Sequence, residues 1–247
     1  MNRRFAIFSA LALLLVFSAC GGRKIAPELS VEQLREAGLA KMEAGDEPAA
    51  RELFENMIAR SSSVAAEALY YIALSYYRQE LYEEAFVRFE QIIDRYPASE
   101  WCDDAQYMKG ESRLASALPL EKDQTAVDEA LDEFLTLVEE YENSPLVPKA
   151  QDGIARARAL KAAKLLAIGK FYRKAGERRA AVVYFENLAA EYPEYERLDE
   201  ATFLAAECYG RLGDIEAASR NYRYLLSRFP ESRFAAAAAS QLAALGG

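Results

Sequence analysis

The sequence predicts an all-α protein, a right-handed α-solenoid of about five helix-turn-helix repeats closed by a C-terminal capping helix. Three observations predict it. One block of small and aromatic residues recurs along the chain, only 12 glycines and 8 prolines occur in 247 residues, and 15 tyrosines are available to pack between helices. The chain is 52% hydrophobic, which is enough for a sizeable core.

Residues 1–19 have the features of a lipoprotein signal peptide rather than of folded structure. Arg3 and Arg4 precede an uncharged run from Phe5 to Phe17. As a helix this run would span about 20 Å, which is short of the roughly 30 Å hydrocarbon core of a bilayer. The segment therefore fits a cleaved signal better than a membrane span.

Cys20 is the expected lipidation site. The apolar run ends in Phe17-Ser18-Ala19-Cys20, which resembles the lipobox of bacterial lipoproteins, with Phe17 where leucine is more usual. In that class the cysteine is acylated, and three acyl chains anchor the protein stably. Gly21 rather than aspartate follows Cys20, which by this resemblance implies export to the outer membrane. The alternative is an ordinary signal peptide with an incidental cysteine.

Residues 20–30 would then be the acylated cysteine and a polar tether. Ten extended residues reach at most about 35 Å, so the solenoid would stay close to the membrane. The other cysteines, Cys102 and Cys208, allow one pairing, and both a disulfide and two free thiols remain open.

One block recurs through the rest of the chain: an alanine, an aromatic residue four positions later, a second aromatic seven positions after that, and often a proline. A fainter copy begins at Ala50-Phe54. The four clear copies are Ala85-Phe89-Tyr96-Pro97, Ala130-Phe134-Tyr141-Glu142, Ala181-Phe185-Tyr192-Pro193 and Ala218-Tyr222-Phe229-Pro230. The alanines lie 35, 45, 51 and 37 residues apart, so two intervals are near 34 and two carry insertions.

This spacing resembles the tetratricopeptide repeat, a pair of antiparallel helices. Small residues allow the helices to approach, and Gly45, Gly176 and Gly213 would supply the turns between them. The aromatic residue fills the gap on the same face as the alanine, and proline ends the second helix. The expected domain covers residues 31–247, with repeats at about 31–62, 66–99, 101–145, 148–195 and 199–231 and a cap at 232–245.

Two breaks in the spacing predict departures from a simple array. A polar segment from Pro119 to Thr125 predicts a loop ahead of a helix that starts near Thr125 or Ala126, with Thr125 as its N-cap. From Pro148 to Ala175 no strong helix breaker occurs except Gly153 and Gly169, which predicts one long helix, or two nearly continuous ones, between the third and fourth repeats.

This bridge also inverts the charge of a chain that carries 30 basic and 39 acidic residues. Ten basic and only two acidic residues lie between Lys149 and Arg179. Two interpretations follow: a solvated face paired with acidic neighbours, or a docking site for an acidic partner. The partner-docking candidates are Arg158, Lys161, Lys170, Arg173, Lys174, Arg178 and Arg211.

A cluster of tyrosines predicts a second site, in the concave groove of the array. Tyrosine and arginine combine apolar area with polar reach and are favoured in binding sites. Packing inside the solenoid is the competing interpretation. The groove candidates are Tyr70, Leu74, Tyr77, Arg78 and Tyr107.

The composition disfavours several functions. The chain has no histidine, which removes Ser-His-Asp and Cys-His catalysis and imidazole-containing zinc sites. Its net charge of −9 disfavours nucleic acid as a partner. Adjacent carboxylates such as Asp103-Asp104 point apart on a helix, so a carboxylate-pair hydrolase is disfavoured as well. We expect no enzymatic activity, no catalytic or metal site, and no cofactor beyond lipid on Cys20.

The lipobox, tether, repeats and internal insertion together resemble the BamD family of outer-membrane β-barrel assembly lipoproteins. The resemblance runs from Cys20 to about Pro230, although Glu142 replaces a usual proline and the first repeat lacks its Tyr-Pro ending. The stretches that carry it are Ser75-Tyr76-Tyr77-Arg78, Tyr107-Met108-Lys109-Gly110, Asp123-Gln124-Thr125 ahead of Ala130-Leu131-Asp132-Glu133-Phe134, and Phe171-Tyr172-Arg173-Lys174-Ala175-Gly176 followed by Ala180-Ala181 and Glu191-Tyr192-Pro193.

The resemblance implies a non-enzymatic scaffold, lipid-anchored at the periplasmic face of the outer membrane. In the family, N-terminal repeats engage the terminal strand signal of unfolded outer-membrane barrel proteins, and C-terminal repeats bind a periplasmic domain of the central β-barrel assembly protein. Here these roles would map onto the groove candidates and onto the last two repeats with the basic bridge. The alternative is another periplasmic tetratricopeptide-repeat adaptor lipoprotein, of the Tol-Pal cell-division coordinator type or the protease-recruiting type.

Overall fold

The computed structural model describes residues 29–117 and 124–246, and over these residues it is all-helical, which confirms the predicted class. The expected signal peptide, Cys20, nearly all of the tether and part of the inserted loop lie outside the described residues. The helices are α1 (Val31–Glu43), α2 (Glu47–Arg60), the 3-10 turn η1 (Ser62–Val64), α3 (Ala65–Arg78), α4 (Tyr82–Arg95), α5 (Cys102–Ser116), α6 (Thr125–Glu140), α7 (Val147–Ala175), α8 (Arg178–Glu191), α9 (Leu198–Leu212), α10 (Ile215–Arg228) and α11 (Ala235–Ala244).

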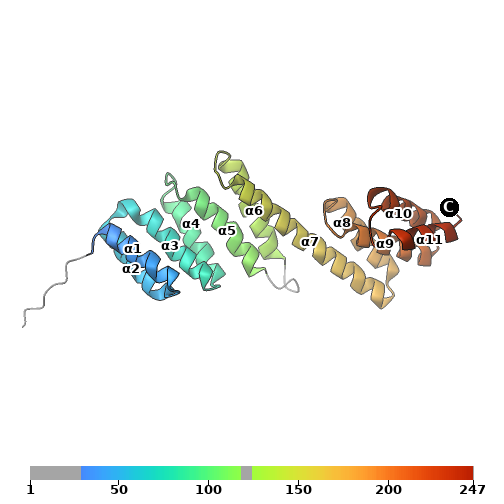
Figure 1. The fold of residues 1–247 in the computed structure, drawn as a ribbon, viewed down its shortest axis with the longest axis horizontal. Helices are drawn as coiled ribbons and strands as arrows, with labels where there is room; N and C mark the ends of the chain where they lie inside the picture. Colours follow the sequence, from blue (N-terminus) through green and yellow to red (C-terminus); the bar gives the residue numbers. More distant parts are fainter. Residues whose placement is uncertain (1–28, 118–123, 247) are drawn as a thin grey trace, which may run out of the picture.

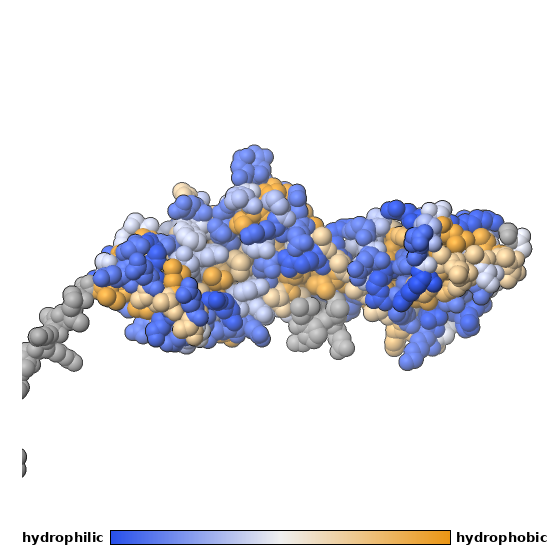
Figure 2. Space-filling model, viewed as in Figure 1, coloured by the Kyte–Doolittle hydropathy of each residue, from blue (hydrophilic) through white to orange (hydrophobic). Residues whose placement is uncertain are grey.

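The helices form hairpins that stack along one long axis (Figure 1). Each helix packs mainly against the helices just before and after it in the chain. The core is accordingly divided into separate clusters along the array rather than gathered at one centre. The visible face in Figure 2 is mostly hydrophilic, with apolar patches between the charged residues. The repeat boundaries and the right-handed sense of the array stay predictions.

The recurring aromatic residue is the centre of each hairpin. Phe134 is fully buried on α6 and lies between two glycines, because a Cβ at Gly110 or at Gly153 would be 2.6 Å from its ring. Likewise, a Cβ at Gly169 would lie 2.5 Å from the ring of Phe185. The small residue of the repeat is therefore required by the ring that it faces.

The predicted bridge is a single helix, α7, of 29 residues. Ala150 and Ala157 in its first half belong to the core formed with α5 and α6, whereas Ala162 and Leu166 belong to the core formed with α8 and α9. Figure 1 shows α7 running obliquely between the two groups of helices. One helix therefore serves two cores, and it fixes the last two hairpins relative to the first three.

The ends of the helices follow local chemistry, with one correction. Gly176 ends α7 with φ 89° and Gly213 ends α9 with φ 84°, a conformation that favours glycine. Thr125 was expected to be an N-cap, and that prediction is wrong by one residue. The backbone N–H groups of Val127 and Asp128 donate to the carbonyl of Gln124, so Gln124 is the cap and Thr125 the first helical residue.

Candidate binding groove and basic face

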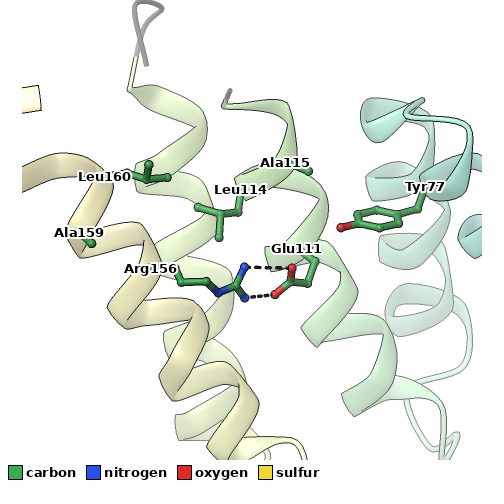
Figure 3. A pocket seen from close by; sticks show the side chains of 7 residues that line it. All are labelled: Tyr77, Glu111, Leu114, Ala115, Arg156, Ala159 and Leu160. Atoms are coloured by element: carbon green, nitrogen blue, oxygen red, sulfur yellow. Dashed lines mark hydrogen bonds and ion pairs between the residues drawn. The ribbon is translucent and has the colours of Figure 1, made fainter. Parts of the chain in front are cut away.

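A cavity of about 440 Å³ opens where α3, α5 and α7 converge (Figure 3). These are the first helices of three successive hairpins, so the cavity lies in the groove that such helices form together. Its volume lies within the range of small-ligand and side-chain sites. Its wall is mostly apolar, with one phenol and one ion pair. The lining residues are Tyr77, Glu111, Leu114, Ala115, Arg156, Ala159 and Leu160.

An ion pair between α5 and α7 organises this cavity. Arg156 directs both terminal nitrogens at the carboxylate of Glu111, and its Nε donates to Asp152 at 2.9 Å. The Glu111 side chain is only 15% exposed, so its charge is held mainly by protein groups. Tyr107 lies next to Glu111 on α5. Burial, together with the negative charge of Glu111, raises the pKa of Tyr107 to about 12.

The structure brings two of the predicted groove residues together. Tyr77 lines the cavity, and its ring meets Tyr82 edge-on at 5.3 Å. Tyr107 does not line the cavity but lies next to Glu111, which does, and its ring centre is 5.9 Å from that of Phe134. One predicted phenol is therefore in the wall of the cavity, and the other neighbours a residue of that wall.

The other three groove candidates have different neighbours. The Tyr70 ring lies 4.8 Å from the Trp101 ring, and burial raises its pKa to about 12. Leu74 is half-buried against both N-terminal cores. Arg78 is exposed, donates to the carbonyl of Met42 at 3.1 Å and lies 3.6 Å from Glu47. Tyr70 and Leu74 therefore contribute to packing between repeats, which was the competing interpretation.

Sequence reasoning did not identify the ion pair and the leucines of the cavity. Glu111 and Leu114 follow Tyr107 at spacings of four and seven residues, so a helical projection of α5 places all three on one face. Arg156 was counted among the ten basic residues of the bridge, but its partner lies 45 residues earlier in the chain. The side-chain periodicity of α5 was the signal that could have found this half of the site.

Four of the partner-docking candidates are held by acidic neighbours. They pair with carboxylates on other elements of the fold, which matches the interpretation of a solvated, ion-paired face. The pairs are Arg158 with Glu194 at 2.6 Å, Lys161 with Asp128, Lys170 with Glu200 at 2.6 Å and Arg173 with Glu207 at 3.3 Å.

The remaining three candidates form no ion pair with any residue that the structure describes. They are Lys174, Arg178 and Arg211. Arg178 and Arg211 line a small cleft of about 100 Å³ together with Arg173, Glu207 and Cys208. One carboxylate thus faces three guanidinium groups, and the exposed Lys174 lies on the same end of α7 as Arg173. Positive charge therefore exceeds negative charge among the residues that line this cleft.

The two described cysteines are both buried and free, which decides between the alternatives left open by the sequence. Burial raises the pKa of each thiol. Among the described residues, no group of three His, Cys, Asp or Glu side chains could hold a metal ion. Within 29–117 and 124–246, no helix has the length and apolarity needed to cross a membrane.

Comparison with known proteins gives a consistent set of relatives. Residues 27–224 match the model of the YfiO family, described as outer membrane lipoprotein. The outer membrane protein assembly factor BamD of Caulobacter vibrioides is 25% identical, over 88% of this chain and 73% of that protein. The BamD of Pasteurella multocida is 28% identical, over 87% of this chain and 88% of that protein. Among solved structures, the complex of the TPR2AB domain of yeast Sti1 with pHSP90 matches with a TM-score of 0.46 and 14% identity, over 81% of this chain and 78% of that chain.

Proposed function

Since this chain belongs to the YfiO family of outer membrane lipoproteins, we propose that it is a non-enzymatic scaffold of the machinery that assembles β-barrel proteins in the outer membrane. The observation that carries the proposal is the family match, which spans both groups of helices joined by α7. Relatives named as outer membrane protein assembly factors support it over most of their own length.

The two proposed binding roles are assigned to two different surfaces. The cavity between α3, α5 and α7 receives apolar or aromatic side chains of unfolded barrel proteins, because its wall is apolar and its charges are paired with each other. The cleft with Arg178 and Arg211 docks an acidic surface on the periplasmic domain of the central β-barrel assembly protein, because its positive charge exceeds that of its own carboxylate. Acyl chains on Cys20 would hold both surfaces at the periplasmic face of the outer membrane.

An affinity pull-down from detergent-solubilised envelope tests this function. The tagged full chain should retain a large β-barrel protein as its main partner, together with unfolded barrel proteins in smaller amounts. Recovery of cell-division or protease partners without a large β-barrel would sink the proposal and favour another periplasmic adaptor.

The anchor has a separate test. A Cys20→Ala variant cannot be acylated on sulfur at that position, so it should move from the membrane fraction to the soluble fraction of the envelope. Substitution of Cys102 by Ala serves as the matched control, because this thiol is buried inside the fold. Continued membrane association of the Cys20→Ala variant would show that something other than this cysteine holds the protein.

A further inference from the structure

A second cavity lies on the other side of α7 from the cavity between α3, α5 and α7. This second cavity measures about 210 Å³ and is formed by α7 and the turn between α8 and α9. Ala159 lines both cavities, so they meet at one point on α7. The residues that line the second cavity are Ala155, Arg158, Ala159, Tyr192, Glu194, Tyr195 and Glu196.

No long side chain of α7 separates the two cavities. Ala155 and Ala159 lie one helical turn apart, and both are exposed. The two arginines beside them are held on opposite sides: Arg156 pairs with Glu111 on α5, whereas Arg158 donates to Glu194 and to the carbonyl of Glu191. Among the described residues, Ala159 is the one that lines both cavities, so a methyl group stands where they meet and a chain can cross α7 at this point.

The two cavities offer the same chemistry. The first combines the Tyr77 ring with the pair of Arg156 and Glu111. In the second, the Arg158 guanidinium lies 5.0 Å from the Tyr192 ring centre and pairs with Glu194. Each cation is thus neutralised within its own cavity. Glu196 adds a further carboxylate to the second cavity, which disfavours an acidic occupant.

Resting on the proposed function, we infer that the groove is continuous across α7 and holds one extended, uncharged segment of an unfolded barrel protein in both cavities. A transmembrane β-strand alternates apolar and polar residues, so its apolar side chains lie on one face and can enter successive cavities. Crossing a helix about 10 Å wide takes about three extended residues at roughly 3.3 Å each. A segment of about eight residues therefore reaches both cavities, and the last two hairpins take part in holding the client.

The experiment compares two uncharged peptides, one of twelve residues with alternating Phe or Ile and Ser or Thr, and its six-residue half. Their binding to the full chain is followed by fluorescence anisotropy. Ala155 lines only the second cavity, so Ala155→Phe fills that cavity and leaves the first one open. The matched control is Ala167→Phe, at an exposed position of the same helix that lines neither cavity.

The longer peptide should bind at least tenfold more tightly than the shorter one. Ala155→Phe should remove this gain without changing the affinity of the shorter peptide, and Ala167→Phe should change neither. On the unsubstituted protein, a photo-crosslinker at one end of the longer peptide should label the segment 192–196.

Equal affinities of the two peptides, or labelling confined to α3 and α5, would overturn the continuous groove and leave the proposed function standing. Failure of both peptides to bind the unsubstituted protein would overturn the proposed client binding together with it.

Discussion

At the scale of single residues, the contact of Phe134 with two glycines controls how closely α5, α6 and α7 can pack. A methyl group at Gly153 would lie 2.6 Å from a fully buried ring, and the ring has glycine on its other side as well. We predict that Gly153→Ala lowers the free energy of unfolding by about 1–3 kcal/mol, because overpacking forces the ring or the helices to shift.

Urea denaturation of the two forms measures this change, and α9 supplies a control of opposite sign. At Gly210 an added Cβ would have only one neighbour, Ala218 at 3.9 Å, which is an ordinary contact. Gly210→Ala should therefore be neutral or should stabilise the protein by up to about 1 kcal/mol through helix propensity. Equal effects at the two glycines would contradict the packing argument.

A second residue, Glu200, should make the stability of the C-terminal half sensitive to acid. Its side chain is 7% exposed and accepts hydrogen bonds from Lys170 and Arg197, both at 2.6 Å. Burial alone would raise the pKa of Glu200, but these two cations outweigh burial and hold the pKa below its usual value. A carboxyl group whose pKa is lowered in the folded protein stabilises the fold at pH values above its pKa in the unfolded chain. This stabilisation is lost as the pH falls through its pKa in the folded protein.

We therefore predict that Glu200→Gln lowers the free energy of unfolding by about 2 kcal/mol at pH 7. Below about pH 4.5, where the carboxyl group of the parent protein becomes protonated on unfolding, the difference between the two proteins should shrink. Urea denaturation at pH 7 and at pH 3.5 tests this. A difference that stays constant between these two pH values would rule out the proposed linkage.

At the scale of elements, α7 illustrates what the sequence could predict. The scarcity of breakers from Pro148 to Ala175 predicted one long helix or two nearly continuous ones, and the structure has a single helix over almost the same residues. The start of α6 at Thr125 agrees with the prediction, but its N-cap was missed by one position, because Gln124 makes no side-chain cap hydrogen bond that a residue preference could reveal. The sequence did not predict that α7 packs into two cores, because this depends on the side of the helix on which each alanine lies once the helices are packed.

The last helix, α11, should act as the cap of the array. Phe234 just before α11 stacks on Phe203 at 5.0 Å, and Ala238 within it is fully buried against the core of α9 and α10. We predict that truncation after Glu231 lowers the melting temperature and causes concentration-dependent association, because the end of a solenoid core becomes exposed.

Thermal unfolding and light scattering measure the two effects of this truncation. Removal of residues 246–247 alone is the control, since Gly246 has no side chain to pack. A truncated protein that stays monomeric with an unchanged melting temperature would show that the array ends at α10.

At the scale of the whole molecule, the repeat array could be predicted from the sequence, but the sites could be predicted only in part. Repeat spacing determines which helices are neighbours, and the structure places Tyr77 in the wall of a cavity between them. The cavity, however, joins Tyr77, Glu111 and Arg156 from three hairpins, and their meeting depends on how far each helix is rotated. Charge counting has the same limit, because it does not reveal which cations already have partners.

The separation of paired and unpaired cations leads to the last prediction, which concerns docking. Neutralisation of the three unpaired charges, by Lys174→Gln, Arg178→Gln and Arg211→Gln together, should weaken retention of the large β-barrel partner at least tenfold and leave the melting temperature nearly unchanged. The reason is that these side chains form no ion pair with a residue that the structure describes, so their loss removes attraction to an acidic partner without breaking an intramolecular pair.

Lys170→Glu should act in the opposite way and lower stability, because it brings a second negative charge against the buried Glu200. Arg223→Gln, at an exposed position on α10 outside the cleft, also removes one positive charge and should alter neither property. Retention by the wild-type chain should also fall as salt increases, since exposed charges are screened at high ionic strength. If the triple variant retains the partner as well as the wild type does at low salt, the basic cleft is not the docking surface, and the excess positive charge of α7 serves only the internal pairing of its helices.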